Sequence, residues 1–334
     1  MAGVILIDSN ITTNTEALFL DIQVDNGNLV FTEDMAGVNQ AFARFTEETS
    51  YGHNHFVNSV SYSPNGKFIA SASDDNTIKI WSINPSSLVH SLAGHGERVN
   101  SIAYNPTGER LVSASMDGTI RIWDTQLGVT LHVLAGHDDG VNVAKYSPCG
   151  CLIYSAAQDG VIKIWDEFTG KPVKTLHGDR ISVNSVSCCP TGRKLVSGSA
   201  DGVIRIWETD TAALLHSIQG HDKSVYGICY HPDGNTFASA SADGTVKIWQ
   251  AETGELLQVF YGHESSVYSV QYSPKGHFVV SASMDRTVKI WDSETGSLLD
   301  SLQGHADTVN SAAYSPDGLS IVSASDDGDV KVWR

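Results

Sequence analysis

Tryptophan recurs at a fixed interval along this chain, and that interval strongly limits what the chain can fold into. The seven tryptophans are each 42 residues apart: Trp81, Trp123, Trp165, Trp207, Trp249, Trp291 and Trp333. An aspartate six residues before each tryptophan keeps the same interval: Asp75, Asp117, Asp159, Asp201, Asp243, Asp285 and Asp327. A period of about 40 residues indicates a repeat architecture in which each unit buries its apolar faces against its neighbours. Seven such periods leave the first 40 of the 334 residues outside the repeats.

Two short signatures accompany the tryptophans. Six repeats begin with a Gly-His pair: Gly52-His53, Gly94-His95, Gly136-His137, Gly220-His221, Gly262-His263 and Gly304-His305. Three repeats end in Trp-Asp, at Asp124, Asp166 and Asp292. In these features residues 52–334 resemble the WD-repeat β-propeller family. The resemblance implies a seven-bladed propeller that serves as a protein-interaction platform, usually without catalysis.

Turn residues divide each repeat into short strands. In the second repeat, Pro106-Thr107-Gly108 and Asp117-Gly118 separate alternating apolar stretches. Proline fixes φ near −65° and glycine permits positive φ, so both sequences favour tight turns. We therefore expect an all-β fold whose seven blades are four-stranded antiparallel sheets.

The N-terminal residues are predicted to form a separate extension, residues 1–37, ahead of a propeller over residues 38–334. Within the extension, Asp25-Asn26-Gly27-Asn28 lies between the apolar runs Ala17–Val24 and Leu29–Phe31. An Asn-Gly step between apolar runs favours a type I′ turn and predicts a β-hairpin.

The last blade needs a fourth strand from elsewhere in the chain, because the sequence stops at Trp333-Arg334, at the end of a third strand. Without it the third strand would leave its backbone groups unpaired. The other fourth strands carry apolar residues five and two positions before the glycine of the Gly-His pair. Counting back from Gly52 gives Glu47 and Ser50, which do not fit this pattern.

Phe42 and Phe45 have the required spacing. We therefore predict that a strand near Val38–Phe45 closes the ring and that Thr46–Ser50 forms a loop insertion. The alternative closing strand is Ala17–Val24.

The charge of the chain is strongly acidic, with 38 Asp and Glu against 21 Lys and Arg, a net charge of −17. This field repels phosphate backbones and anionic lipid, so nucleic acid and membranes are not expected as partners. One base stands two residues before each tryptophan: Lys79, Arg121, Lys163, Arg205, Lys247, Lys289 and Lys331. A base that occurs once in every blade is interpreted as architectural.

Cysteine usage and the N-terminus bear on location. The five cysteines include no C-x-x-C pair and are interpreted as small apolar residues in a reducing compartment. No metal site and no cofactor are expected. The first ten residues lack a basic segment, and no apolar run approaches the ~20 residues of a membrane helix. We expect a soluble cytoplasmic protein, with the nucleus as a further location.

Serine, histidine and aspartate recur with fixed spacing in the blades, and a catalytic interpretation has to be weighed. A hydrolase needs one pre-organised triad with an oxyanion hole and gains nothing from six copies. The resemblance implies instead a structural network with the tryptophan. Its members here are His53, Ser71, Asp75 and Trp81; His95, Ser113, Asp117 and Trp123; His137, Ser155, Asp159 and Trp165; His221, Ser239, Asp243 and Trp249; His263, Ser281, Asp285 and Trp291; and His305, Ser323, Asp327 and Trp333.

The fourth repeat departs from this pattern. Asp179 follows Gly178 where the other repeats have histidine, so Ser197, Asp201 and Trp207 lack an imidazole. This departure is interpreted as a local loss of stability that the fold tolerates. In the alternative interpretation, the loop is released from the network so that it can contact a partner.

The positions at which the repeats differ are candidates for partner binding. The residue after the first-strand valine, which in the resembled family points to the narrower face, is Asn in five repeats, including Asn100, and Tyr226 and Tyr268 in the other two. The residues before the structural aspartates include Asp74, Met116, Met284 and Asp326. Asp74 and Asp326 belong to the first and last blades, which are neighbours in a closed ring.

These side chains suggest a pocket for an arginine or lysine of a partner, since carboxylates and aromatic rings both attract such groups. In the alternative interpretation the asparagines bond local backbone at β-bulges and the carboxylates are merely solvated.

Two function classes remain open. The first is a non-enzymatic scaffold or adaptor subunit of a multiprotein complex, with a monomeric propeller that binds proteins presenting a basic or extended segment. The alternative is a recognition module for short basic or modified peptides at the narrower face. An enzyme is not expected, because every candidate catalytic group is repeated.

Overall fold

The computed structural model describes residues 21–25, 28–32, 45–178 and 180–334. The chain divides into two units, residues 1–43 and 44–334, and each is described by itself. Asp179 and most of the predicted strand Val38–Phe45 lie outside the described residues.

The first unit contains one antiparallel strand pair. β1 (Asp21–Asp25) pairs with β2 (Asn28–Thr32), with Asp25 opposite Asn28. The pair lies where the Asn-Gly step predicts a hairpin. The alternative in which Ala17–Val24 closes the ring is wrong, because β3 (Glu47–Gly52) and not β1 pairs with β30 (Asp329–Trp333).

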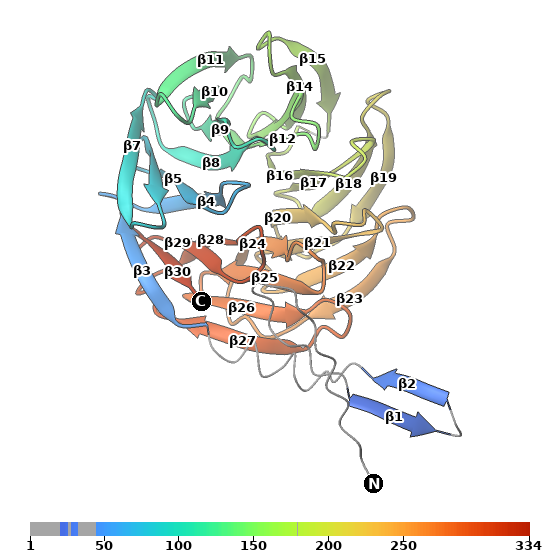
Figure 1. Cartoon of the computed structure of the whole chain (residues 1–334). Coiled ribbons are helices and arrows are strands. Elements are labelled where there is room, and N and C mark those ends of the chain that lie inside the picture. Colours follow the sequence, from blue (N-terminus) through green and yellow to red (C-terminus); the bar gives the residue numbers. More distant parts are fainter. Residues whose placement is uncertain (1–20, 26–27, 33–44, 179) are drawn as a thin grey trace. The chain divides into compact units, whose positions relative to one another are not determined.

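The second unit is a propeller of seven four-stranded antiparallel sheets, which confirms the predicted fold class (Figure 1). Its blades are numbered along the chain. Blade one contains β4 (Val57–Tyr62), β5 (Phe68–Ser73), β6 (Thr77–Ser82) and β7 (Ser87–Ala93). Blade two contains β8 (Val99–Tyr104), β9 (Arg110–Ser115), β10 (Thr119–Asp124) and β11 (Val129–Ala135). Blade three contains β12 (Val141–Tyr146), β13 (Leu152–Ala157), β14 (Val161–Asp166) and β15 (Pro172–His177).

The remaining blades repeat the order. Blade four contains β16 (Val183–Cys188), β17 (Lys194–Ser199), β18 (Val203–Glu208) and β19 (Leu214–Gln219). Blade five contains β20 (Val225–Tyr230), β21 (Thr236–Ser241), β22 (Val246–Gln250) and β23 (Leu256–Phe260). Blade six contains β24 (Val267–Tyr272), β25 (Phe278–Ser283), β26 (Thr287–Asp292) and β27 (Leu298–Gln303). Blade seven contains β28 (Val309–Tyr314), β29 (Ile321–Ser325), β30 (Asp329–Trp333) and β3 (Glu47–Gly52).

The first strands of neighbouring blades contact one another in a closed circle, from β4 through β8, β12, β16, β20 and β24 to β28 and back to β4. They surround the centre, and the fourth strands lie on the outside (Figure 1).

The tryptophans hold successive blades together. Trp123 of blade two lies in one apolar cluster with Ile78 and Ile80 of blade one. Trp81 of blade one packs in the same way with Val330 and Val332 of blade seven, so the apolar contacts continue across the closure. Burying a large aromatic between sheets favours their association by several kcal/mol, on the order of 25 cal/mol per Å² of apolar area.

The closing strand is the N-terminal strand β3, so the prediction of closure by an N-terminal strand is confirmed. Its predicted position is wrong, because Glu47–Gly52 pairs with β30, whereas Thr46–Ser50 was predicted to be a loop. Arg334 and Thr46 extend the pairing by backbone hydrogen bonds in both directions.

The error in position has a physical cause, a register one residue shorter than elsewhere. In blade one, Leu92, two residues before the glycine, pairs with Ile78. In blade seven the equivalent Val330 pairs with Tyr51, one residue before the glycine. Tyr51 is buried and occupies the place of Leu92, so counting from Gly52 pointed to the wrong residues.

The cysteines require a second correction. Cys149 and Cys151 form a disulfide, whereas all five cysteines were expected to remain thiols. Gly150 between them has φ +75°, and this turn folds the chain back so that the two Cα atoms are 5.5 Å apart. Cys188, Cys189 and Cys229 are thiols.

In the part of the chain that the structure describes, no helix is long and apolar enough to cross a membrane.

Candidate functional site

Each complete network joins four side chains, from a loop, two strands and the turn between those strands. In blade two, His95 precedes β8, Ser113 lies on β9, Asp117 lies in the turn between β9 and β10, and Trp123 lies on β10. Trp123 Nε1 donates to Ser113 Oγ at 2.8 Å, His95 Nε2 lies 2.7 Å from the same oxygen, and His95 Nδ1 lies 2.8 Å from Asp117 Oδ2.

The protonation of the network follows from burial and hydrogen bonding. Burial lowers the pKa of His95 below its usual value, against the attraction of Asp117. Burial also opposes ionisation of Asp117, but donors from Thr119, Gly96 and His95 together lower the pKa of Asp117 to about 2. The neutral imidazole therefore donates from Nδ1 to the carboxylate, the serine hydroxyl donates to Nε2, and the indole donates to the serine oxygen.

The structure repeats this arrangement in five more blades. The corresponding distances lie between 2.7 and 2.9 Å in the networks of His53, His137, His221, His263 and His305. The serines Ser71, Ser113, Ser155, Ser239, Ser281 and Ser323 have no exposed surface. No substrate can reach these hydroxyls in the folded state, so the groups with triad-like order fasten the loop to the blade.

In blade four, which has no network histidine, an arginine lies beside the aspartate. Trp207 still donates to Ser197 at 2.9 Å. Arg205 is 3% exposed, donates to Ser199 Oγ at 3.1 Å, and lies 3.7 Å from the Asp201 carboxylate. Sequence reasoning missed this role because every blade has a base at this position. The sequence offered little signal, because blade two combines an arginine at this position, Arg121, with an intact His95.

The other bases at this position are also structural where their bonds are seen. Lys79, Lys247 and Lys331 donate to the carbonyl oxygens of Gly52, Gly220 and Gly304, at the Gly-His pairs. Threonines two residues after the aspartate, such as Thr119, donate twice to its second oxygen. The Asp-x-Thr spacing could have revealed this contact in the sequence.

In six blades the His–Asp bonds join the loop that enters the blade to the turn between its second and third strands. The face of the propeller that carries these loops and turns is called the Gly-His face below. The predicted partner-binding residues lie at the inner ends of these elements, after the first-strand valine or before the structural aspartate.

Asparagine after the first-strand valine fastens one blade to the next. Asn100 Nδ2 donates to the carbonyl of Val141 in blade three at 2.9 Å. Four further amides make the same bond to the next first-strand valine at 2.9–3.0 Å: Asn58 to Val99, Asn142 to Val183, Asn184 to Val225 and Asn310 to Val57. The side-chain amide of Asn100 therefore has a structural role, because it links blade two to blade three.

Tyrosine replaces this asparagine in blades five and six. Tyr226 and Tyr268 pack against each other with ring centroids 4.9 Å apart and an interplanar angle of 45°. The Tyr268 hydroxyl lies 3.9 Å from the sulfur of Met284, which is 50% exposed. Gly227 follows Tyr226, and a Cβ there would lie 3.1 Å from Ser269 Cα, so the backbones of the two blades touch below the rings.

Two carboxylates lie close to this aromatic pair. Asp74 and Asp326 each accept a 2.7 Å hydrogen bond from the asparagine of their own blade, Asn58 and Asn310. Burial raises the pKa of Asp326, and repulsion by Asp307, Asp74 and Asp327 adds to it. Burial raises the pKa of Tyr268 as well, with contributions from Tyr226 and Asp326. The charge of Asp326 thus interacts with both Asp74 and Tyr268.

Met116 lies in blade two. Its sulfur is 3.3 Å from Gln158 Nε2, and the residue lines a hollow of about 370 Å³ together with Asp117, His137 and Asp139. The structure therefore joins Tyr226, Tyr268 and Met284 by contact and links Asp326 to Tyr268 and to Asp74 by charge. Asn58 bonds both Asp74 and the carbonyl of Val99, the residue before Asn100.

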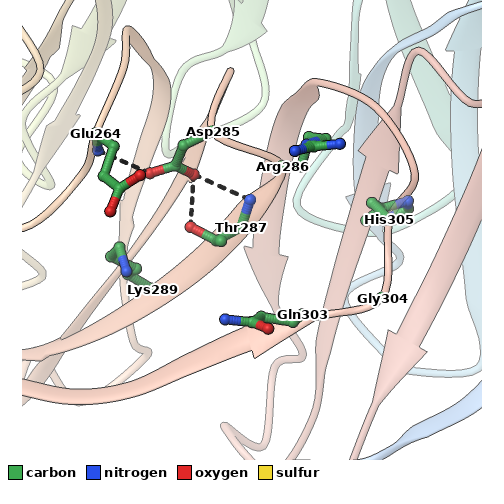
Figure 2. A pocket seen from close by; sticks show the side chains of 8 residues that line it. All are labelled: Glu264, Asp285, Arg286, Thr287, Lys289, Gln303, Gly304 and His305. Atoms are coloured by element: carbon green, nitrogen blue, oxygen red, sulfur yellow. Dashed lines mark hydrogen bonds between the residues drawn. The ribbon is translucent and has the colours of Figure 1, made fainter.

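The equivalent hollow between blades six and seven has a volume of about 340 Å³ and contains both signs of charge (Figure 2). Asp285 in its wall accepts hydrogen bonds from the Glu264 amide and from Thr287. Arg286 and Lys289 also line it. Within the described residues, no group of three or more potential ligands could hold a metal ion.

Comparisons with known proteins agree with the fold. The family described as WD40, "WD domain, G-beta repeat", matches seven segments: residues 45–82, 86–124, 128–166, 170–208, 212–250, 254–292 and 296–334. The WD40 repeat-containing protein HOS15 of Arabidopsis thaliana is 49% identical over 45 residues, which are 14% of this chain and 7% of that protein. The ribosome biogenesis protein BOP1 homolog of Dictyostelium discoideum is 51% identical over 41 residues, 12% of this chain and 5% of that protein. The matched stretch thus spans less than a tenth of either relative.

Proposed function

Because the chain belongs to the WD-repeat family, whose propellers are generally non-catalytic protein-interaction modules, we propose that it is a non-enzymatic scaffold subunit of a multiprotein complex. Its partner binds the Gly-His face at the sector formed by Tyr226, Tyr268, Met284, Asp74 and Asp326. We place this activity in the cytoplasm and the nucleus, with the propeller as a monomer.

The replacement of asparagine by tyrosine in two adjacent blades is the observation that carries this proposal. In the other five blades that position is occupied by a ring-fastening amide. Tyr226 and Tyr268 lack such an amide, and they offer rigid aromatic area, which binding interfaces favour because little side-chain entropy is lost.

Charge favours a basic segment in the partner. Burial first, and then repulsion by neighbouring carboxylates, raises the pKa of Asp326, and an arginine or lysine placed against this carboxyl would stabilise its charge. The same cation could lie over the face of Tyr268. The net charge of −17 would speed the approach of a basic partner, while it disfavours nucleic acid and anionic membranes.

A second candidate function is recognition of short basic or modified peptides at the same residues. It is favoured by the compact size of the sector, which five side chains define. The two functions differ in what they need: a scaffold requires a folded partner, whereas a peptide reader binds an isolated basic peptide in the micromolar range.

The test is purification of the tagged chain from its native cells with identification of the accompanying proteins. The wild type is compared with the Tyr226→Ala/Tyr268→Ala and Asp74→Lys/Asp326→Lys variants. A stoichiometric partner that is lost from both variants, with their melting temperatures retained, supports the proposal. Partners that are unchanged in both variants would contradict the proposed sector, and binding of short basic peptides alone would favour the reader.

A further inference from the structure

The outermost strand of blade two, β11 (Val129–Ala135), differs from the other fourth strands. Exposure alternates along it, and the outward row contains Val129, Leu131, Val133 and Ala135. Within the described chain it is the one fourth strand with three exposed branched apolar side chains in a single alternating row. Its seven residues include no proline, glycine, lysine, aspartate or glutamate.

The outer edge of β11 is available for pairing. In the sheet order β11-β10-β9-β8 it is the terminal strand, and no described strand pairs with its far side. Natural edge strands usually carry a charge or a proline that prevents further pairing. Three other fourth strands follow that rule, with Glu47 in β3, Pro172 and Lys174 in β15 and Asp300 in β27, whereas β7, β19 and β23 carry neither a charge nor a proline. β11 lacks this protection.

An acidic hollow lies at the C-terminal end of β11. The hollow of about 370 Å³ is lined by Ala135 of the strand and by Asp138 and Asp139 of the following loop, both exposed. No base lines it, whereas Arg286 and Lys289 line the equivalent hollow between blades six and seven. In that hollow Arg286 occupies the position that Gly118 occupies here.

We propose that β11 and this hollow form a second docking surface, which takes an extended partner segment as a fifth, antiparallel strand of blade two. Main-chain hydrogen bonds to the open edge supply affinity. Every second side chain of the partner segment contacts Val129, Leu131 and Val133 and supplies specificity. Because the added strand runs antiparallel, its N-terminal end lies beside Ala135. The partner segment therefore carries lysine or arginine first, beside Asp138 and Asp139, and alternating apolar residues afterwards.

Charge argues for such a partner over a second copy of this chain. Two copies would bring two acidic hollows and two charges of −17 together, which costs electrostatic energy. A segment with basic residues at its N-terminal end gains from the same field.

The test uses two fluorescein-labelled synthetic peptides and the full chain, with binding followed by fluorescence anisotropy. One peptide begins with Lys-Lys and continues with alternating valine and threonine, and the other has the reverse order. We expect saturable binding of the first peptide and weaker binding of the second. Equal binding of both, or no binding of the first, would overturn the proposal.

Matched variants separate this surface from general effects on the fold. Leu131→Lys/Val133→Lys is expected to weaken binding by about tenfold or more, since it removes apolar contact and adds like charge. Leu215→Lys/Ser217→Lys makes the same change on β19 of blade four and is expected to leave affinity unchanged. Equal weakening by both pairs would overturn the assignment to β11, provided that thermal melts show both variants folded.

The acidic hollow and the occupant are tested separately. Asp138→Asn/Asp139→Asn is expected to weaken the Lys-Lys-first peptide several-fold and to leave the reversed peptide unchanged, because only the first places its charges at the hollow. A dimer in solution that the Leu131→Lys/Val133→Lys variant dissociates would identify a second copy as the occupant and would overturn the proposed partner segment.

Discussion

Tyr51 of the closing strand packs against Trp81 of the first blade, with ring centroids 5.2 Å apart, and its hydroxyl donates to the Ser82 carbonyl at 3.3 Å. The residue thus joins blade seven to blade one, in addition to the pairing of β3 with β30. Removing the Tyr51 side chain should weaken the closure of the ring, because this side chain contacts both blade one and blade seven.

Tyr51→Ala is expected to destabilise the protein by about 3 kcal/mol, the usual cost of deleting a buried aromatic side chain. Tyr51→Phe keeps the packing and loses one hydrogen bond, so it should cost about 1 kcal/mol or less. Equilibrium unfolding in urea measures both. Equal losses in the two variants would show that the hydroxyl, and not the ring, carries the contact.

Arg205 gives a second prediction, for the blade without a network histidine. Arg205→Ala should destabilise by about 2 kcal/mol, because it removes the donor to buried Ser199 and the positive charge beside the Asp201 carboxylate, which still accepts from the Val203 amide. The matched control is Lys163→Ala in blade three, where His137 already satisfies Asp159. A loss of stability no greater than that of the control would contradict the role assigned to Arg205.

The ring could be predicted from the strict repeat, and the six complete networks from the resemblance to the WD-repeat family together with that repeat. The period of the tryptophans determines how many blades there are, and His95, Ser113, Asp117 and Trp123 recur at fixed spacing in the blades. Tyr51 was missed for the opposite reason. The one-residue change in register occurs at the closure alone among the described blades, so the other repeats do not reveal it.

The candidate sites show the same limit. Tyr226 and Tyr268 stand out as exceptions in an aligned column of asparagines, so their position could be predicted. The hydrogen bond from Asn100 to the next blade could not be predicted, because it joins residues 41 positions apart that only the packing of two sheets brings together. The disulfide of Cys149 and Cys151 depends on a turn conformation at Gly150 that the spacing of the cysteines did not indicate.

The buried histidines predict how stability depends on pH. Burial lowers the pKa of His53, His95, His137, His221 and His263 below the usual 6.5. The unfolded chain therefore binds more protons than the folded one as pH falls below about 6.5, and protonation favours unfolding. The stability that these groups contribute is present above pH 6.5 and is lost at lower pH.

The network aspartates act in the same direction at lower pH. Although burial opposes it, hydrogen bonds hold the pKa of Asp75, Asp117 and Asp327 at about 2, below the usual 3.8. Their contribution is present above pH 4 and is lost as pH falls toward 2. Calorimetric melting temperatures should fall from about pH 6.5 downward. A constant or rising melting temperature between about pH 7 and 5 would contradict neutral, buried imidazoles.

The asparagine ring and the tyrosine sector can be separated by exchanging their residues. Asn100→Leu removes the bond to Val141 and should destabilise by about 1 kcal/mol while partner capture is unchanged, because the amide serves the ring alone. Tyr226→Asn restores the residue that five other blades carry, so its effect on stability should stay below about 1 kcal/mol. Partner capture should be lost, because the variant removes the aromatic ring that packs against Tyr268. Capture that depends on Asn100 as strongly as on Tyr226 would assign partner binding to the asparagine ring and remove the special role of the tyrosines.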